Sequence, residues 1–187
     1  MPKIIGIGSQ KSVGKSTLAK YLVTILRMRN QGKKIKVISF ADGVKNVSYQ
    51  VFGWMGLKEG VYYEDHYQEK EIPLPCGLTP RDIWIAVGNG MREIDKRAWI
   101  LSALHDIDDY DIIIISDLRF VDEAEALEEL KACLVKLNRE VPRGTDPAEV
   151  SLLGWKKWCK DLDNNGTLQD LYQRAEEIAD YLEKEWS

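Results

Sequence analysis

The residues with the clearest chemical signature form the segment Ser12-Val13-Gly14-Lys15-Ser16-Thr17. The segment follows an apolar run over residues 3–8 and opens a stretch of helical periodicity over residues 15–29. At a strand-to-helix turn of this kind, backbone N–H groups, the positive end of the helix and a lysine ammonium can hold phosphates. The Ser16 hydroxyl is placed to ligate Mg²⁺. The sequence therefore predicts a nucleotide-phosphate loop made of Lys11, Ser12, Val13, Gly14, Lys15, Ser16 and Thr17.

The loop departs at one position from the pattern G-x-x-x-x-G-K-[ST], because Ser9 stands in the place of the first glycine. A glycine there permits a tight turn, so Ser9 must reach the same backbone shape with a Cβ atom, or the loop is slightly altered. The alternative interpretation is a chance Gly-Lys-Ser at an ordinary helix start. The apolar run before the loop and the amphipathic stretch after it favour the phosphate site.

A second candidate site follows four consecutive isoleucines at residues 112–115, where the sequence continues Ser116-Asp117-Leu118-Arg119. A carboxylate at the end of a buried strand, next to a phosphate loop, can hold a Mg²⁺–water shell. We therefore predict that Ser16 and Asp117 are the metal ligands. Alternatively, Asp117 only caps or turns the chain. Arg119 could stabilise charge on a transferred phosphoryl group, or it could pair at the surface with Asp122 or Glu123.

Other cations lie near predicted strand ends or in loops, and each by itself is more often a surface residue than a site residue. They are Lys11, Lys45, Arg81, Arg92, Arg97, Arg139 and Arg143. Residues 139–155 are rich in Pro and Gly, and Arg139 and Arg143 flank a Pro–Gly hinge. Such a lid can close over phosphates, exclude water and deliver arginines, as phosphoryl transfer requires.

Composition excludes several classes of function. The chain has 187 residues, of which 44% are hydrophobic and 30% charged, with a net charge of -4. A surface that coats nucleic acid would need a basic excess, so no nucleic-acid partner is expected. The three cysteines are sparse and form no C-x-x-C pair, which suits a reducing compartment and argues against structural zinc. The apolar runs are too short for a signal peptide or a membrane span, so a soluble cytoplasmic protein without a membrane partner is expected.

The pattern of elements predicts an α/β fold, a three-layer doubly wound parallel sheet over a single domain, residues 1–187. Predicted strands cover residues 3–8, 35–40, 111–116, 133–137 and 160–163. Predicted helices cover residues 15–29, 44–52, 79–87, 96–104, 122–130 and a last segment capped by Thr167. Gly88-Asn89-Gly90 is expected to interrupt a helix, Asp122 with Glu125 to form a capping box, and residues 53–78 have no assigned element. Ligands of such sheets bind at the carboxyl ends of the strands.

Several segments together resemble phage-type deoxynucleoside monophosphate kinases (deoxynucleotide monophosphate kinases), which have the P-loop nucleotide kinase fold. The resemblance spans residues 3 to about 172. Its segments are residues 12–17, Phe40-Ala41-Asp42-Gly43-Val44-Lys45, Leu78-Thr79-Pro80-Arg81, Val87-Gly88-Asn89, Arg92-Glu93, Trp99, residues 115–120 with Glu123, and residues 163–168. The chain departs from the family at Ser9, at Ser16, where members often have Asp, and at Gly43-Val44, which replaces Pro-Leu.

The resemblance implies ATP as the phosphoryl donor and a deoxynucleoside 5′-monophosphate as the acceptor. It implies a helical acceptor-binding insertion over residues 41–107 and a short lid over residues 139–155. Lys15 then lies on the donor side, with Asn165 and Gly166 lining the donor adenine. The acceptor side takes Asp42, Lys45, Arg81, Gly88, Arg92 and Trp99, although a tryptophan more often packs than stacks on a base. The catalytic residues would be Lys15, Arg119, Arg139 and Arg143, with Mg²⁺ as cofactor, in a monomer or homodimer within the cytoplasm (the host cytoplasm if phage-encoded).

Three alternatives stay open. A kinase of the same fold could act on another small acceptor, such as dephospho-coenzyme A or phosphomevalonate. A hydroxyl acceptor would need a general base, and Asp42 is the candidate. The chain could instead be a nucleotide-hydrolysing switch module, although it lacks an obvious guanine-reading N-K-x-D motif, or a degenerate loop protein with a structural role.

Overall fold

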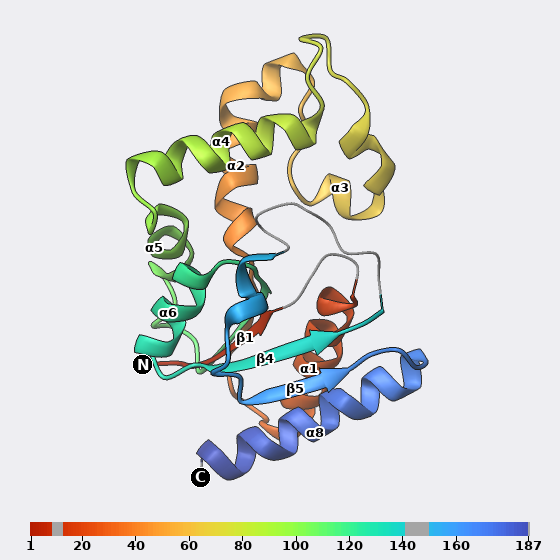
Figure 1. Ribbon diagram of the computed structural model, residues 1–187, viewed down its shortest axis with the longest axis vertical. Helices are drawn as coiled ribbons and strands as arrows, with labels where there is room; N and C mark the ends of the chain where they lie inside the picture. The colour runs from red at the N-terminus through yellow and green to blue at the C-terminus, as the bar shows by residue number, and fades with distance from the viewer. Residues whose placement is uncertain (9–12, 141–149, 187) are drawn as a thin grey trace. The chain divides into compact units, whose positions relative to one another are not determined.

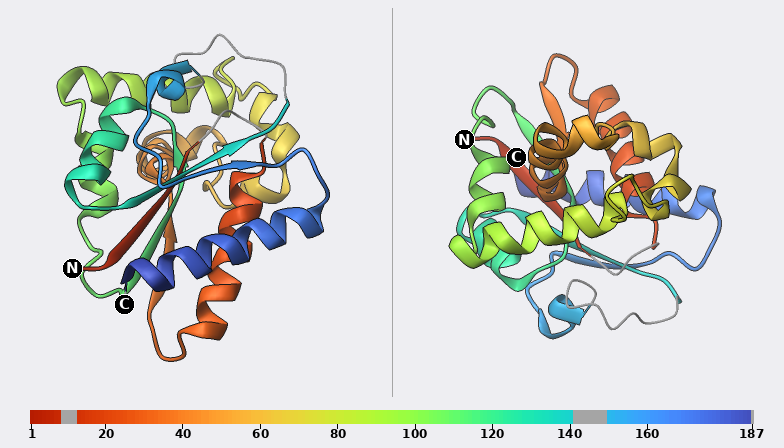
Figure 2. Two further views of the ribbon diagram at one scale, coloured as in Figure 1. Left: turned by 60° about the horizontal axis from the view of Figure 1, so that its bottom comes forward. Right: turned by 90° about the horizontal axis from the view of Figure 1, so that it is seen from above.

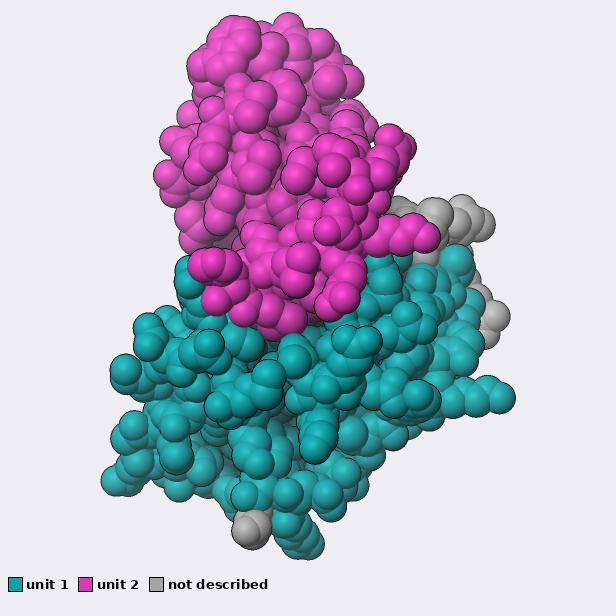
Figure 3. Space-filling view, turned by 90° about the vertical axis from the view of Figure 1, so that its left-hand side faces the viewer, with its two compact units in different colours: residues 1–38, 106–187 teal, residues 39–105 magenta. Residues whose placement is uncertain are grey.

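The computed structural model describes residues 1–8, 13–140 and 150–186. Lys11, Ser12 and Arg143, three of the predicted site residues, lie outside these ranges. The chain divides into two compact units, residues 1–38 with 106–187 and residues 39–105, which Figure 3 shows in two colours. The predicted phosphate loop falls within the residues of the first unit, and the second coincides closely with the region from which we expect acceptor binding.

A five-stranded parallel sheet forms the centre of the first unit (Figure 1). Its strands are β1 (Lys3–Gly8), β2 (Ile35–Ile38), β3 (Ile112–Leu118), β4 (Cys133–Asn138) and β5 (Lys160–Asp163), in the order β2-β3-β1-β4-β5. Because β1 and β3 are neighbours and parallel, with Gly6 opposite Ile115 and Gly8 opposite Leu118, their carboxyl ends share one edge. Gly8, the last residue of β1, and the polar end of β3 therefore lie at that edge, where ligands of α/β sheets bind.

Helices cover both faces of this sheet, which confirms the predicted three-layer α/β architecture. On one face, α1 (Lys15–Arg29) and α8 (Leu168–Trp186) lie side by side (Figure 2). Alternate residues of β1, β3 and β4 join them in one buried cluster, while α6 (Val121–Glu129) covers the other face and packs against β1 and β4. This alternation is the period of two that a strand imposes on its side chains.

Two close approaches in β1 depend on glycine. A Cβ atom on Gly6 would lie 2.8 Å from Leu134 and 3.0 Å from Leu127, so the α6 layer packs directly on the backbone of the strand. A Cβ atom on Gly8 would lie 2.6 Å from the Trp158 ring, which reaches the sheet edge just before the phosphate loop. Gly6 and Gly8 therefore allow neighbouring side chains to pack directly on the backbone of β1.

The second unit is helical. It contains α2 (Phe40–Phe52), η1 (Gly53–Met55), α3 (Tyr62–Asp65), η2 (Tyr67–Glu71), α4 (Pro80–Ile94) and α5 (Ala98–Leu104). A small apolar cluster of Leu57, Tyr63 and Ile83 joins the segment of residues 53–78, to which the sequence assigned no element, to α4. A Tyr63–Trp84 edge contact at 5.1 Å supports the same junction.

Three sequence predictions about helices were wrong. Residues 40–43 belong to α2 rather than to a strand end and a turn, because Ser39 and Asp42 form a capping box that starts the helix at Phe40. Gly88 and Gly90 do not interrupt α4, which runs to Ile94. Each glycine lowers the stability of a helix by about 1 kcal/mol relative to alanine. The start of α4 carries two stabilising features, a Thr79–Asp82 capping box and Pro80 in the first turn.

The third correction concerns α6. The Glu123 side chain caps the backbone at its start, in place of the expected capping box of Asp122 with Glu125, and the helix begins at Val121. The Glu123 carboxylate is buried and accepts the backbone N–H groups of Arg119 at 2.8 Å and Phe120 at 3.0 Å. The turn that follows the Asp117 strand is therefore fixed by a buried charge with two donors, which is the condition under which burying a carboxylate is tolerated.

Candidate functional site

The start of α1 places Gly14 and Lys15 at the carboxyl end of β1. Gly14 is the N-terminal cap of the helix and has a positive φ of 99°, which a residue with a side chain adopts only under strain. Lys15, the first helical residue, has a relative exposure of 8%, so most of its side chain is shielded from solvent. A buried lysine next to the free N–H groups of a helix start is suited to binding an anion.

Asn164 holds this turn from the other side of the first unit. It follows β5, is 6% exposed, and its Nδ2 donates a hydrogen bond of 2.7 Å to the Val13 carbonyl. Its own backbone N–H donates to the Asn138 carbonyl at 2.8 Å, so the end of β4 fixes Asn164 in turn. Sequence reasoning did not single out Asn164, because its contact is 151 residues away along the chain.

We expect Gly14→Ala to destabilise the protein and to weaken ATP binding. The left-handed backbone costs a residue with a Cβ atom roughly 1–2 kcal/mol, and this Cβ would lie 2.6 Å from the Asn164 Nδ2. Thermal unfolding should show a melting temperature lower by roughly 2–8 °C. Gly32→Ala is the matched control, since Gly32 has a φ of 85° with nothing within 4 Å. Equal losses of stability and of ATP affinity in both variants would contradict the role of Asn164.

The polar end of β3 lies beside this turn. Asp117 is the second-last residue of the strand and is partly buried, and Ser116 Oγ lies 3.5 Å from the carbonyl of Ile38 on the adjacent strand. Arg119 follows, and its backbone N–H donates to the buried Glu123 carboxylate at 2.8 Å, while the roles expected of its side chain stay predictions. Ser16 and Asp117 offer hydroxyl and carboxylate oxygens, the donors that Mg²⁺ prefers.

This pair also fits the way in which Mg²⁺ is usually bound. In the described residues, no group of three or more His, Cys, Asp or Glu side chains could hold a metal ion. Mg²⁺ usually takes only one or two protein ligands and completes its shell with water and substrate phosphates. A site of one hydroxyl and one carboxylate beside a phosphate loop is therefore compatible with the ion.

The ends of β4 and β5 bring the remaining donor-side residues together. The backbone N–H of Glu140, next to Arg139, donates to Asn165 Oδ1 at 2.8 Å, and Asn165 also bonds Asp163 through its backbone and side chain. Gly166 leads into the Thr167 cap of α8. There the Thr167 N–H and hydroxyl donate to Asp170, which holds the pKa of that carboxyl below its usual value. The structure therefore ties Arg139 and Asn165 to one edge.

In the second unit, three cations come together: Lys45 on α2, Lys70 in η2 and Arg81 in the first turn of α4. The Arg81 Nε lies 2.5 Å from Glu71 Oε1, and the Lys45 Nζ lies 3.9 Å from Asp42 Oδ1. The pKa of Lys70 is lowered, first by burial and then by the positive charges of Lys45 and Arg81. Two of the three cations thus have a carboxylate beside them, while the positive charges of Lys45 and Arg81 still act on Lys70.

Lys70 was missed by sequence reasoning, which assigned no element to residues 53–78. The fold of that segment explains its place in the cluster: a Cβ on Gly60 would lie 2.7 Å from the Lys45 side chain, so this loop packs directly on Lys45. The Lys70 ammonium also lies 4.2 Å from the centre of the Tyr67 ring. Nothing in the local sequence marks Lys70 among the other lysines of the chain.

The other predicted acceptor residues have structural roles or lie elsewhere on the unit. Trp99 is 5% exposed, its indole donates to the Gly88 carbonyl at 3.0 Å, and its ring packs on Gly43, so it fastens α5 to α2 and α4. Asp42 caps α2. Arg92 lies eleven residues after Arg81 on α4, which corresponds to about 16 Å along the helix axis.

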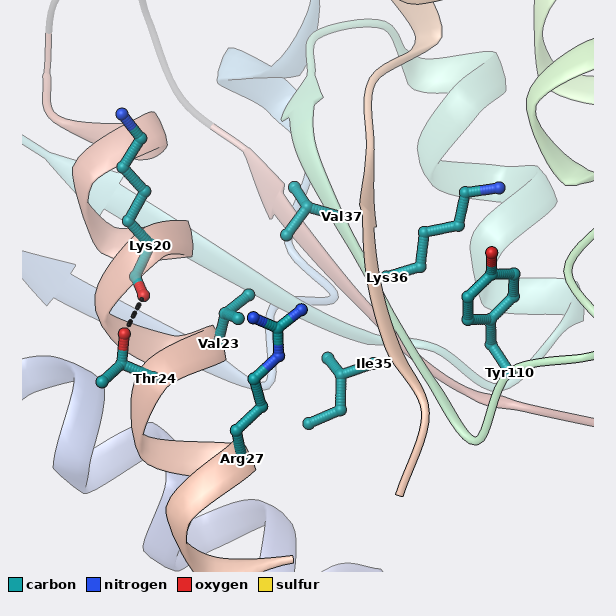
Figure 4. Close-up of a pocket in the computed structure, with 8 residues that line it drawn as sticks. All are labelled: Lys20, Val23, Thr24, Arg27, Ile35, Lys36, Val37 and Tyr110. Atoms are coloured by element: carbon teal, nitrogen blue, oxygen red, sulfur yellow. Dashed lines mark hydrogen bonds between the residues drawn. The ribbon is translucent and has the colours of Figure 1, made fainter. Parts of the chain in front are cut away.

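An open groove also lies between the middle of α1 and the edge strand β2 (Figure 4). Its lining residues are Lys20, Val23, Thr24, Arg27, Ile35, Lys36, Val37 and Tyr110. Lys36 points toward Tyr110, with its ammonium 4.8 Å from the ring centre, while Arg27 points toward Val37. Because the groove faces the flank of α1 rather than its first turn, it is separate from the strand-end residues described above. Among the described residues, no helix is long and apolar enough to cross a membrane.

One curated protein is similar to this chain over almost its whole length. It is described as a putative deoxynucleotide monophosphate kinase of Acanthamoeba polyphaga mimivirus, and it is 28% identical over 189 residues, which cover 91% of this chain and 93% of that protein. No protein-family model matches the chain. The resemblance to this enzyme family that the sequence motifs indicated is thereby confirmed.

Solved structures give weaker likenesses. Shikimate kinase from Aquifex aeolicus is 15% identical, with 96% of each chain covered and a TM-score of 0.42. A sugar kinase from Janibacter sp. is 16% identical, with 96% of this chain and 95% of that chain covered and a TM-score of 0.42. A plasmid partition protein from Borrelia burgdorferi, bound to AMPPNP, is 14% identical, with 98% and 100% covered and a TM-score of 0.43. These likenesses carry no argument about the chemistry of this chain.

Proposed function

We propose that the protein transfers the γ-phosphoryl group of ATP to a deoxynucleoside 5′-monophosphate and releases the diphosphate. The observation that carries the proposal is the buried Lys15 at a positive-φ turn between β1 and α1, fastened by Asn164. The likeness to the mimivirus protein supports the acceptor class. The cation cluster of Lys45, Lys70 and Arg81 gives the second unit a place for the acceptor phosphate.

The proposed chemistry needs little beyond alignment and charge neutralisation. An acceptor phosphate is already an anion near neutral pH, so no strong general base is required. Lys15 and the loop amides bind the donor phosphates, while Arg119 and the lid arginines Arg139 and Arg143 stabilise the spread charge of the transferred group. When bound by Ser16 and Asp117, Mg²⁺ supplies further neutralisation of the phosphate oxygens. Asn165 and Gly166 line the donor base in this proposal.

On the acceptor side, we assign the phosphate to Lys45, Lys70 and Arg81. The positive charges of Lys45 and Arg81 repel the Lys70 ammonium, and a bound phosphate dianion would offset this repulsion. Arg92, at the other end of α4, is assigned to another part of the acceptor because the helix separates it from Arg81 by about 16 Å. Trp99 and Gly88 support the site through packing rather than through contact with the substrate.

A coupled assay with ATP and each common nucleoside and deoxynucleoside monophosphate tests the proposal directly. We expect ADP formation that depends on the acceptor, with one or more deoxynucleoside monophosphates as the best substrates. Rapid ATP hydrolysis with no phosphorylation of any nucleotide would support a switch module instead. Failure to bind ATP–Mg²⁺ in calorimetry would support a structural role and overturn the proposal.

The variant Asp42→Asn separates a phosphate acceptor from a hydroxyl acceptor. An Asn side-chain oxygen can still accept the Ser39 N–H that Asp42 accepts at 3.0 Å, so the start of α2 is retained. If the acceptor is a nucleotide phosphate, kcat should stay within about threefold of wild type. Loss of a general base for a hydroxyl acceptor would lower kcat by about 10²–10⁴-fold. Circular dichroism of the variant provides the folding control.

A further inference from the structure

Two cysteines that the sequence keeps 26 residues apart are neighbours in the sheet. Cys133 begins β4, and Cys159 directly precedes β5. The Cys159 N–H donates to the Leu134 carbonyl at 2.7 Å, which continues the register in which Val135 lies opposite Lys160. Strands lie about 4.8 Å apart and rise about 3.3 Å per residue, so the Cys133 and Cys159 Cα atoms are ~6 Å apart. That spacing is within the range of natural disulfides.

The two sulfurs lie close enough to affect each other's ionisation, and the Tyr181 hydroxyl of α8 lies beside Cys159. Cys133 belongs to the buried cluster formed by α1, α8 and the inner face of the sheet. The Cys159 sulfur is hydrogen bonded by the Cys133 thiol, by the Leu134 N–H and by the Tyr181 hydroxyl of α8. Cys159 is exposed whereas Cys133 is buried, and neither forms a disulfide. One thiol is therefore accessible to small reagents and the other is placed behind it.

The environment of each sulfur assigns it a different part in a reaction. The hydrogen bond from Cys133, followed by those of Leu134 and Tyr181, lowers the pKa of Cys159 to about 6 against the effects of burial and of the Glu185 charge. The hydrogen bond to Cys159 and burial raise the pKa of Cys133, although Lys160 acts in the opposite direction. Cys159 is therefore the more readily ionised thiol of the pair, and Cys133 holds its proton more strongly. The thiolate is the nucleophile in cysteine oxidation.

We propose that Cys159 and Cys133 form a peroxide-reactive dithiol that closes into an intramolecular disulfide. The Cys159 thiolate attacks one oxygen of hydrogen peroxide and the O–O bond breaks. The leaving hydroxide takes up a proton to become water, and Cys159 is left as a sulfenic acid. The Cys133 sulfur then attacks the Cys159 sulfur, the S–O bond breaks, and the hydroxyl leaves with the Cys133 proton as a second water. The two thiols together give up two electrons to one peroxide.

This modification site does not depend on the proposed kinase activity. It lies at the start of β4 and β5, whereas the residues assigned to the donor phosphates lie at the opposite, carboxyl ends of the strands, and those assigned to the acceptor phosphate belong to the second unit. The third cysteine, Cys76, is exposed in the second unit. Cys76→Ser therefore gives a full-length background in which only the pair can react.

The test treats the Cys76→Ser protein with hydrogen peroxide and follows intact mass and free thiols. We expect both thiols to disappear together, with a mass loss of two hydrogen atoms that a reductant reverses, and a cross-linked peptide that joins Cys133 to Cys159. Covalent dimers alone, or stable addition of oxygen to Cys159 without cross-linking, would overturn the proposal. Because this background leaves the core side chain of Cys133 intact, the result does not depend on a variant that might fail to fold.

Two further variants on the same background separate the parts. In the Cys133→Ala variant, the Cys159 sulfenic acid should accumulate and be trapped by dimedone. In the Cys159→Ser variant, Cys133 should be oxidised at least about tenfold more slowly than the thiols of the Cys76→Ser protein, because thiols react far more slowly than thiolates. The rate of Cys159 alkylation by iodoacetamide should level off above about pH 7 in the folded protein. In denaturant it should keep rising toward the ordinary thiol pKa of ~8.5. Identical profiles in the folded and denatured protein would contradict the assignment.

Discussion

Lys15→Ala lowers kcat/KM for phosphoryl transfer by at least ~10²-fold, the scale of losing one preorganised charge contact. The expectation rests on the position of Lys15, which is the first residue of α1, is 8% exposed and follows the strained Gly14 turn. A lysine fixed in this way requires no reorganisation when charge develops on the phosphates, whereas a flexible surface lysine would. Steady-state rates with ATP and the best acceptor from the nucleotide panel provide the measurement.

Lys20→Ala is the matched control for this loss. Lys20 lies on the same helix and is exposed. Its replacement changes the net charge and the helix composition as much as Lys15→Ala does, but it leaves the first turn of the helix unchanged. We expect its rate to stay within about twofold of wild type. A folded Lys15→Ala protein with a near-wild-type rate, or an equal loss in both variants, would disprove the donor site.

The second large effect concerns the acceptor. Lys70→Met should raise KM for the monophosphate by about 10–100-fold, since a hydrogen bond to a charged group contributes about 1.5–3 kcal/mol. Methionine keeps most of the side-chain volume beside Tyr67 but removes the charge that lies close to Lys45 and Arg81. KM for ATP should change by less than about twofold, because the donor phosphates are bound by residues of the first unit.

Lys58→Met provides the comparison within the same unit, since Lys58 is exposed and has no place in the cation cluster. We expect it to leave both KM values unchanged. Lys70→Arg, which retains the charge, should restore most of the acceptor affinity. If Lys70→Met instead changes KM for ATP and monophosphate alike, the cluster is not an acceptor site, although the donor site at Lys15 would be unaffected by that result.

Much of the first unit was determined by local sequence. The strand of residues 3–8 and the helix from Lys15 to Arg29 were predicted with the bounds that the structure has. Strand and helix periodicity are local signals, and a buried parallel strand such as Ile112–Leu118 is marked by its continuous apolar run. Two of the three errors about helices occurred where start signals act over three or four residues, at Ser39–Asp42 and at Glu123, and the third concerned the glycines inside α4.

The tertiary structure decided which distant side chains became neighbours. Asn164 reaches the Val13 carbonyl, Lys70 lies near Lys45 and Arg81, and Cys159 lies near Cys133, in each case across many residues of the chain. The reason is physical: such contacts depend on strand order and on how an irregular segment packs, and both are set by burial over the whole unit rather than by neighbouring residues. The sequence by itself therefore determined where β1 ends and α1 begins, while the fold determined what surrounds and supports that point.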